Sequence, residues 1–221
     1  MGEKRVFTYD PALFEARDLA QARHIILTPE AGQGTDERWA TETPYLGQLL
    51  GEQLGLRGEQ LVIDYGCGIG RMSKELIARF GVRVLGVDIS QQMRGMAPGY
   101  VGSAAFSVVS RGMLQRMVAA GLRADAAISV WVLQHCAAPA EDIALIRSAL
   151  TPEAPVGIVN TFARVVPTRE GGFISDELDL KALLAAEMPL LAEGALDAGV
   201  VGRYIAEATY WSVHRAGPAK T

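Results

Sequence analysis

The chain has 221 residues, of which 49% are hydrophobic and 21% are charged, and this is the composition of an ordinary globular protein. A chain of this length suits one domain with a sizeable core and leaves room for a small lid. The formal net charge of −4 gives no electrostatic reason to expect a nucleic-acid partner, because duplex binding usually requires a basic face.

Cysteine content and hydropathy point to a reducing compartment. Cys67 and Cys136 are far apart and lack the spacing of a zinc motif, so neither a disulfide framework nor a zinc site is suggested. The N-terminus has no apolar run of signal-peptide length, and nothing approaches the ~18 to 20 apolar residues of a membrane span. A cytoplasmic protein without membrane attachment is the expectation.

The first quarter of the chain is expected to be helical. Apolar positions before residue 30 fit one or two helices, and the Pro/Gly-rich residues 28–35 predict a loop. Leucines at helical spacing then predict a helix that stops near Gly55. Thr43 is its expected N-cap and Pro44 its expected first helical residue.

The rest of the chain alternates short apolar runs with amphipathic segments. The predicted strands are 61–64, 82–88, 105–109, 126–130, 156–160 and 208–215. Residues 164–202 are expected to hold one helix around 178–187 and a connector into a last hairpin. Strands alternating with helices imply parallel βαβ units. The predicted fold is therefore a doubly wound, mostly parallel α/β sheet of seven strands with helices on both faces.

A glycine-rich turn follows the first predicted strand. Ligands of open parallel sheets bind beyond the carboxyl ends of the strands, and glycines allow the backbone to approach a ligand closely. The next helix presents free N–H groups to an anionic group. A dinucleotide fingerprint would continue Gly66 and Gly68 with glycine at position 71, but the chain has Arg71 there and its third glycine is Gly70.

The spacing of these three glycines, with Asp64 upstream and Asp88 at the end of the second strand, resembles the first motifs of class I S-adenosylmethionine (SAM)-dependent methyltransferases. The resemblance covers about residues 61–162 and the aromatic strand near the end. It implies SAM as cofactor, S-adenosylhomocysteine (SAH) as product and Asp88 as the ribose-binding acid. The implied cofactor-binding residues are Asp64, Gly66, Cys67, Gly68, Gly70, Arg71, Asp88, Ile89, Met93, Ser110, Met113, Val130 and Trp131.

Several of these residues have a plainer interpretation. Arg71 is expected either at the cofactor carboxylate or as a solvated residue at a helix start. Cys67 is expected as a small packing residue, and Met93 and Met113 also fit core filling. Residues 110–114 lack the acid that the family often uses for the adenine amino group. Ser110, or a backbone carbonyl near Met113, is the expected replacement.

Residues 125–135 resemble the small-molecule branch of the family, in which the fourth strand runs into an apolar segment ending in histidine. They do not resemble the Asn/Asp-Pro-Pro-Tyr/Phe motif of enzymes that methylate amino groups of adenine or glutamine. The resemblance implies that Val130 and Trp131 border the methyl-transfer centre. His135 is a candidate general base because histidine titrates near neutral pH, and the alternative is a pocket-wall histidine.

The expected organisation is an N-terminal helical lid or cap over residues 1–55 and a SAM-binding domain over residues 56–221. Within the latter, residues 164–202 are a possible acceptor-pocket region. Trp39 and Tyr45 are the expected lid residues that exclude water. No carboxylate cluster suggests a metal site, so no metal is predicted.

The expected function is SAM-dependent methyl transfer to O, N or C of a small-molecule metabolite. The expected partner is that acceptor, with neither nucleic acid nor membrane. Two alternatives stay open: an NAD(P)-dependent oxidoreductase, which Arg71 disfavours, and a non-catalytic SAM-binding module.

Overall fold

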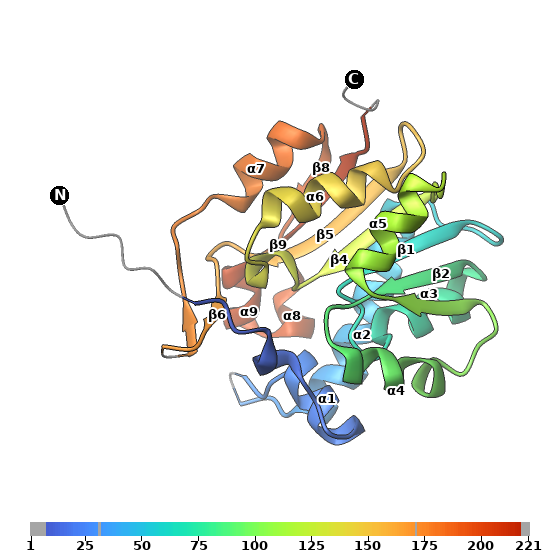
Figure 1. Ribbon diagram of the computed structural model, residues 1–221. Coiled ribbons are helices and arrows are strands. Elements are labelled where there is room, and N and C mark those ends of the chain that lie inside the picture. The colour runs from blue at the N-terminus through green and yellow to red at the C-terminus, as the bar shows by residue number, and fades with distance from the viewer. Residues whose placement is uncertain (1–7, 31, 171, 218–221) are drawn as a thin grey trace.

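The computed structural model describes residues 8–30, 32–170 and 172–217, and the predictions made for residues 1–7 and Ala31 lie outside these ranges. A seven-stranded sheet crosses the molecule in the order β3-β2-β1-β4-β5-β9-β8 (Figure 1). Its strands are β1 (Leu61–Tyr65), β2 (Arg83–Val87), β3 (Phe106–Val109), β4 (Ala126–Val130), β5 (Pro155–Thr161), β8 (Leu190–Gly194) and β9 (Thr209–Arg215). Strands β1 to β5 pair in parallel, whereas β9 is antiparallel to both β5 and β8. The predicted mostly parallel sheet of seven strands is confirmed.

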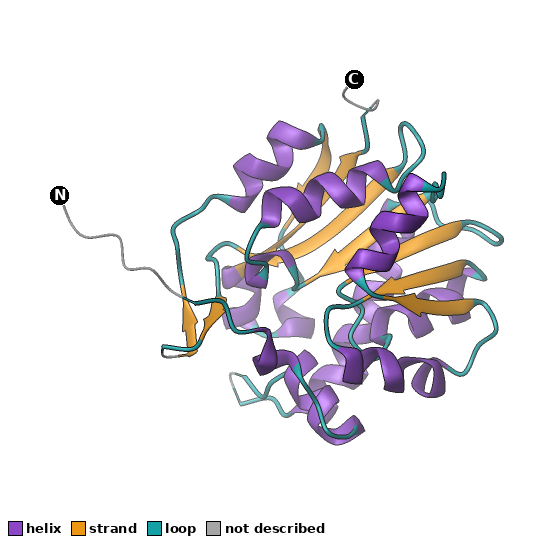
Figure 2. Cartoon of the chain, viewed as in Figure 1, coloured by secondary structure: helices purple, strands orange, loops and turns teal. Residues whose placement is uncertain are grey.

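Helices cover both faces of the sheet (Figure 2). One core cluster joins the sheet to α5 (Arg111–Ala119), α6 (Pro139–Ser148) and α7 (Leu180–Glu187). The other joins it to α2 (Thr35–Gln53), α3 (Arg71–Phe80), α4 (Gln91–Val101), α8 (Ala198–Val201) and α9 (Arg203–Ala208). Ile63 belongs to the first cluster and its neighbour Val62 to the second, because successive strand side chains point to opposite faces.

Helix α2 begins earlier than its sequence suggests. It starts at Thr35 after the N-cap Gly34, so the prediction that Thr43 caps it and Pro44 opens it is wrong. Pro44 lies inside the helix, where proline removes one backbone hydrogen bond and would normally mark a boundary. The helix continues across it because its buried residues, Leu46 and Leu50 among them, pack into the core of the main sheet. Tertiary packing outweighs the local penalty here.

Residues 8–18 form an N-terminal strap that lies against a small hairpin with no clear sequence signal. The strap contains η1 (Pro11–Phe14) and leads to α1 (Leu19–Ile26), and the hairpin consists of β6 (Val166–Thr168) and β7 (Gly172–Ile174). The Asp10 N–H donates to the Pro167 carbonyl at 3.1 Å, and Tyr9 forms a bridge with Thr168. These contacts join the N-terminal strap to the hairpin of β6 and β7, which lies far away in the sequence.

None of the helices within the described ranges has the length and apolarity required to cross a membrane.

Candidate functional site

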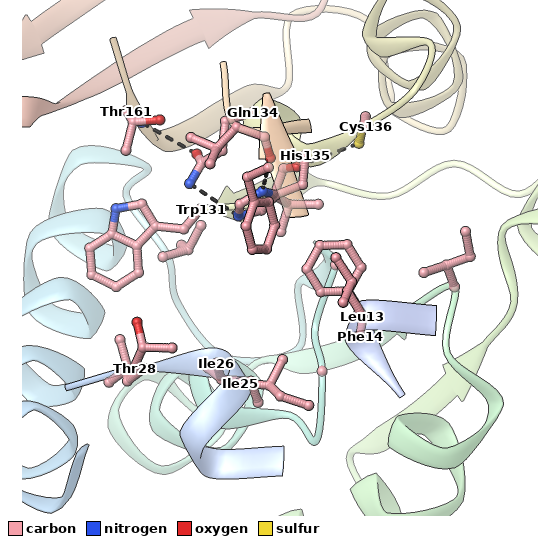
Figure 3. A pocket seen from close by; sticks show the side chains of 18 of the residues that line it. Leu13, Phe14, Ile25, Ile26, Thr28, Trp131, Gln134, His135, Cys136 and Thr161 are labelled. Carbon is pink, nitrogen blue, oxygen red and sulfur yellow. Dashed lines mark hydrogen bonds between the residues drawn. The ribbon is translucent and has the colours of Figure 1, made fainter. Parts of the chain in front are cut away.

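A cavity of about 980 Å³ lies where the carboxyl ends of β1, β2 and β4 meet the N-terminal segment. In Figure 3, Leu13, Phe14, Ile25 and Ile26 of that segment lie opposite residues that follow β4. Residues predicted as site residues that line the cavity are Gly66, Gly68, Arg71, Asp88, Ile89, Met93, Val130, Trp131 and His135.

The glycine loop needs glycine for two physical reasons. Gly66, Gly68 and Gly70 have φ values of +81°, +56° and +87°, in a region that side-chain-bearing residues rarely adopt. A Cβ atom on Gly66 would also collide with the Val132 side chain. The Gly66 N–H anchors the loop to the end of β2 by donating to the Val87 carbonyl at 2.7 Å.

Asp64 stabilises the two segments that flank this loop. One carboxylate oxygen, Oδ2, accepts the Ser73 N–H at 3.1 Å and the Ser73 hydroxyl at 2.7 Å. Burial raises the pKa of Asp64 to about 6, and the Ser73 hydrogen bonds only partly offset that rise. Asp64 does not line the cavity, so in this structure it ties the end of β1 to the first turn of α3.

Asp88 lies directly after β2 and faces the cavity. Its Oδ2 accepts the Gly68 N–H and its Oδ1 accepts the Ser90 N–H, both at 2.8 Å. A carboxylate offers about four acceptor positions, so each oxygen keeps the capacity for one more hydrogen bond. Burial raises the pKa of this carboxyl. The arrangement suits a ligand with two adjacent hydroxyl groups.

Arg71 brings a buried cation to the cavity wall. Its side chain is 3% exposed, and its guanidinium lies 5.7 Å from the Trp39 ring centroid and 5.5 Å from that of Trp131. Burial lowers its pKa to about 10, so it remains charged near neutral pH. The hydrogen bond described for it, from Nη1 to Thr43 Oγ1 at 3.2 Å, leaves other N–H groups for an anionic ligand.

Trp131 lies close to Arg38 of helix α2 and to Arg71 at the start of helix α3. It has a φ of +55°, an uncommon conformation for a large side chain, and Arg38 lies 5.7 Å from its ring centroid. Arg38 is fixed by the fully buried Glu42, whose two carboxylate oxygens accept from it at 2.6 and 3.2 Å. Arg38 also donates to the Thr28 carbonyl at 2.6 Å. This ion pair therefore links the N-terminal segment to the wall after β4; sequence reasoning did not single out Glu42.

His135 lies in η2 (Leu133–His135), between two aromatic rings. Its Nδ1 is 2.6 Å from the Val165 carbonyl, so Nδ1 carries the proton and donates it. The Nε2 atom of the neutral ring then has a lone pair, which the Gln134 amide approaches at 3.4 Å. Burial lowers the pKa of His135, which favours this neutral form. The ring centroids of Phe14 and Phe173 lie 5.3 and 5.7 Å away.

A carboxylate that the sequence did not reveal also lines the cavity. Asp142, in the first turn of α6, accepts the Tyr65 hydroxyl at 2.5 Å and the Arg111 Nε at 2.7 Å, both on Oδ1. Its neighbour Cys136 is a free thiol whose pKa burial raises well above its usual value.

Other predicted site residues lie outside the cavity lining, namely Trp39, Tyr45, Asp64, Cys67, Gly70, Ser110 and Met113. The Trp39 indole N–H donates to the Tyr100 hydroxyl at 3.0 Å, and the Tyr45 hydroxyl accepts the Asp197 N–H at 2.8 Å. The Ser110 hydroxyl accepts the Met113 N–H and so caps α5. The structure thus gives these side chains packing or capping contacts.

Phe14, Phe173 and Gln134 were not predicted as site residues. The two phenylalanines come from separate segments that only the tertiary fold brings to one histidine, so no local pattern could have identified them. Within the described part of the chain, no group of three or more His, Cys, Asp or Glu residues is placed to hold a metal ion.

The sheet order and the glycine loop after β1 define a Rossmann-like α/β protein with a cavity at the carboxyl ends of its central strands. Residues 62–153 match the family model described as a methyltransferase domain. No curated protein matches the sequence. Residues 62–153 therefore carry a methyltransferase domain.

Solved structures share this fold at low sequence identity. The N-methyltransferase NodS from Bradyrhizobium japonicum WM9, in complex with SAH, is 16% identical with a TM-score of 0.61, over 81% of this chain and 88% of that chain. The cyclase SpnF is 18% identical with a TM-score of 0.60, over 80% and 82%. The CurJ carbon methyltransferase is 12% identical with a TM-score of 0.64, over 91% of this chain and 59% of that chain.

Proposed function

We propose that the chain transfers a methyl group from SAM to a small-molecule acceptor, and that donor and acceptor share the cavity described above. The observation that carries this proposal is that Arg71 and Asp88 line the same cavity beside one glycine loop. Arg71 offers charge-assisted donors to the cofactor carboxylate, and Asp88 offers two acceptor positions to the ribose hydroxyls. When bound, SAM supplies an electrophilic methyl group on its sulfonium sulfur.

The protein's own contribution is positioning and the exclusion of water. Val130 and Trp131 line the cavity at the end of β4, and the N-terminal strap covers it from the other side. His135 is suited to accept a proton at Nε2 from an acceptor that must lose one, because its Nδ1 proton is committed to Val165. The Asp142 carboxylate offers the adenine end an acid that residues 110–114 lack.

A cytoplasmic location fits this function. Its support is that Cys67 and Cys136 are both free thiols, as is usual in a reducing compartment.

Titration calorimetry with SAH and with NADH, on the same preparation, tests the proposal. We expect SAH to bind at one site per chain and NADH to give no binding heat. NADH binding without a response to SAH would contradict the proposal and favour the oxidoreductase. SAH binding without methyl transfer to any acceptor would favour the non-catalytic SAM-binding module.

A further inference from the structure

Aromatic side chains from five separate segments line the cavity, and together they are called its aromatic wall. The His135 ring is tilted by 56° to Phe14 and by 52° to Phe173, and Phe162 and Tyr204 also line the cavity. These side chains come from η1, η2, the β5–β6 connection, β7 and α9, so the wall is a product of the tertiary fold. Aromatic walls with few polar groups are typical of sites for small organic ligands.

Three of these side chains are unusually exposed for residues that line a cavity. Phe173 is 50% exposed, Phe162 54% and Tyr204 60%, and Leu13 beside them is 41% exposed. A scattered apolar residue on a protein surface needs no explanation, but a set that lines one cavity marks a ligand-binding surface. Because these residues line the cavity, an apolar ligand would bury them.

Charged groups near this wall already have partners. Glu207 accepts from Arg203 at 2.7 Å, and Arg38 is paired with Glu42. Elsewhere in the cavity, Arg71 and Asp88 are assigned to the cofactor, and Asp142 is paired with Arg111. A charged acceptor would therefore lose its hydration on binding without gaining an unpaired counter-ion, and this desolvation costs binding free energy.

One polar atom of this wall is Nε2 of the neutral His135 ring, an acceptor that the Gln134 amide approaches at 3.4 Å, a contact that a ligand group would have to replace. The matching ligand group is a donor, such as a hydroxyl. The volume of about 980 Å³ is at the upper end of the ~300 to 1,000 Å³ found for ligand pockets, so it has room for a second molecule beside a cofactor.

We infer that the methyl acceptor is an uncharged aromatic compound bearing a hydroxyl group, with its ring against Phe14 and Phe173 and its hydroxyl on His135. This inference rests on the proposed methyl-transfer function, since it assigns the remaining end of the same cavity.

The test uses 1-naphthol, the anion 1-naphthoate and unsubstituted naphthalene as probes, each titrated calorimetrically into the protein with and without saturating SAH. We expect 1-naphthol to bind in both conditions and at least ~10-fold more tightly than 1-naphthoate. The anion would lose its hydration on binding and find no unpaired cation in the cavity, whereas the neutral phenol needs none. Equal or tighter binding of 1-naphthoate would overturn the inference.

Two leucines make a matched pair of variants. Leu13, which lines the cavity, and Leu19, which does not, are 41% and 45% exposed. Leu13→Ala should weaken 1-naphthol binding about three- to tenfold by removing apolar contact, and Leu19→Ala should leave it unchanged. Equal effects of the two substitutions would place the probe outside this cavity and refute the inference.

The hydroxyl contact has its own control. Wild type should bind 1-naphthol about five- to tenfold more tightly than naphthalene, and His135→Phe should abolish that preference. A preference that survives in His135→Phe would refute the assigned contact. If SAH fails to bind while these results hold, the methyl-transfer proposal fails and the aromatic binding end stands. If SAH binds but 1-naphthoate is preferred over 1-naphthol, the inference about the acceptor fails and the methyl-transfer proposal stands.

Discussion

Arg71 is the residue on which the proposed choice of SAM over a dinucleotide depends. It occupies the position where a dinucleotide fingerprint requires glycine, and the structure turns its guanidinium into the cavity between two tryptophan rings. The sequence left its role open between a solvated helix start and a cofactor contact. Its 3% exposure excludes the solvated alternative.

Arg71→Met keeps much of the aliphatic stem and removes the charge. We expect SAH affinity to fall about 10- to 100-fold, because a charge-assisted hydrogen bond contributes ~1.5 to 3 kcal/mol. The control ligand is 5′-methylthioadenosine, which lacks the amino-acid part and should bind both proteins equally. Equal losses for both ligands in calorimetry would show that Arg71 shapes the whole cavity instead of reading the carboxylate.

Asp64 should make stability depend on pH. Its pKa rises from 3.8 to about 6 on folding, so the folded state holds the proton more tightly than the unfolded state does. The free energy of unfolding should therefore decrease as the pH rises from about 3.8 to about 6, and then level off. Asp64→Asn removes this titration while keeping an oxygen that can accept from Ser73. Urea unfolding of both proteins at pH 4.5 and pH 7.5 should show a smaller pH effect for the variant, and parallel curves would contradict this account.

His135 predicts a pH profile for methyl transfer. Burial lowers its pKa from 6.5, so the ring should already be neutral, and able to accept a proton, below that pH. With 1-naphthol as acceptor, the rate should rise with pH and reach its plateau below pH 6.5, and His135→Gln should lose this rising limb together with most of the rate. An unchanged profile in the variant would reduce His135 to a wall residue.

At the scale of elements, alternating patterns predicted the strands well. Each of the runs at 61–64, 126–130 and 156–160 forms a strand because both faces of the sheet are buried, and this demands continuous apolar residues. The loop after β1 was predictable because its backbone conformation and close packing require glycine.

Other elements could not be predicted, since their structure depends on distant partners. Pro44 wrongly suggested a helix start, because the packing of α2 on the sheet depends on residues far away in the sequence. The hairpin of β6 and β7 has only three residues in each strand and gains a neighbour from the N-terminal strap. Phe14 of the strap and Phe173 of the hairpin both line the cavity, beside this contact between the two segments.

Replacing either of two helical glycines by alanine should change the free energy of unfolding, in opposite directions. A Cβ on Gly51 of α2 would collide with the Phe80 ring, whereas one on Gly95 of α4 would meet no atom within 4 Å. Gly95→Ala should raise the free energy of unfolding by ~0.5 to 1 kcal/mol, as expected in an exposed helix interior. Gly51→Ala should lower it by ~1 to 3 kcal/mol through overpacking. Chemical unfolding measures both, and a shared sign would contradict the described packing of α2 on α3.

At the scale of the whole molecule, the site is assembled from both ends of the described chain. The carboxyl ends of the central strands supply the glycine loop and Asp88, while the N-terminal strap and the segments after β5 complete the cavity. The boundary predicted at residue 55 stays a prediction, although α2 already packs in the main core. The proposed cofactor half of the site was readable from the sequence, because it is local and needs special backbone geometry. The proposed acceptor half was not, because it is built from scattered side chains.

The most direct measurement is a crystal structure of the protein with SAH. We predict that the SAH carboxylate lies within hydrogen-bond distance of Arg71, that the ribose hydroxyls lie on Asp88, and that the sulfur faces Trp131 with the aromatic wall beyond it. SAH bound outside this cavity, or bound inside it with its carboxylate turned away from Arg71, would contradict the assignment.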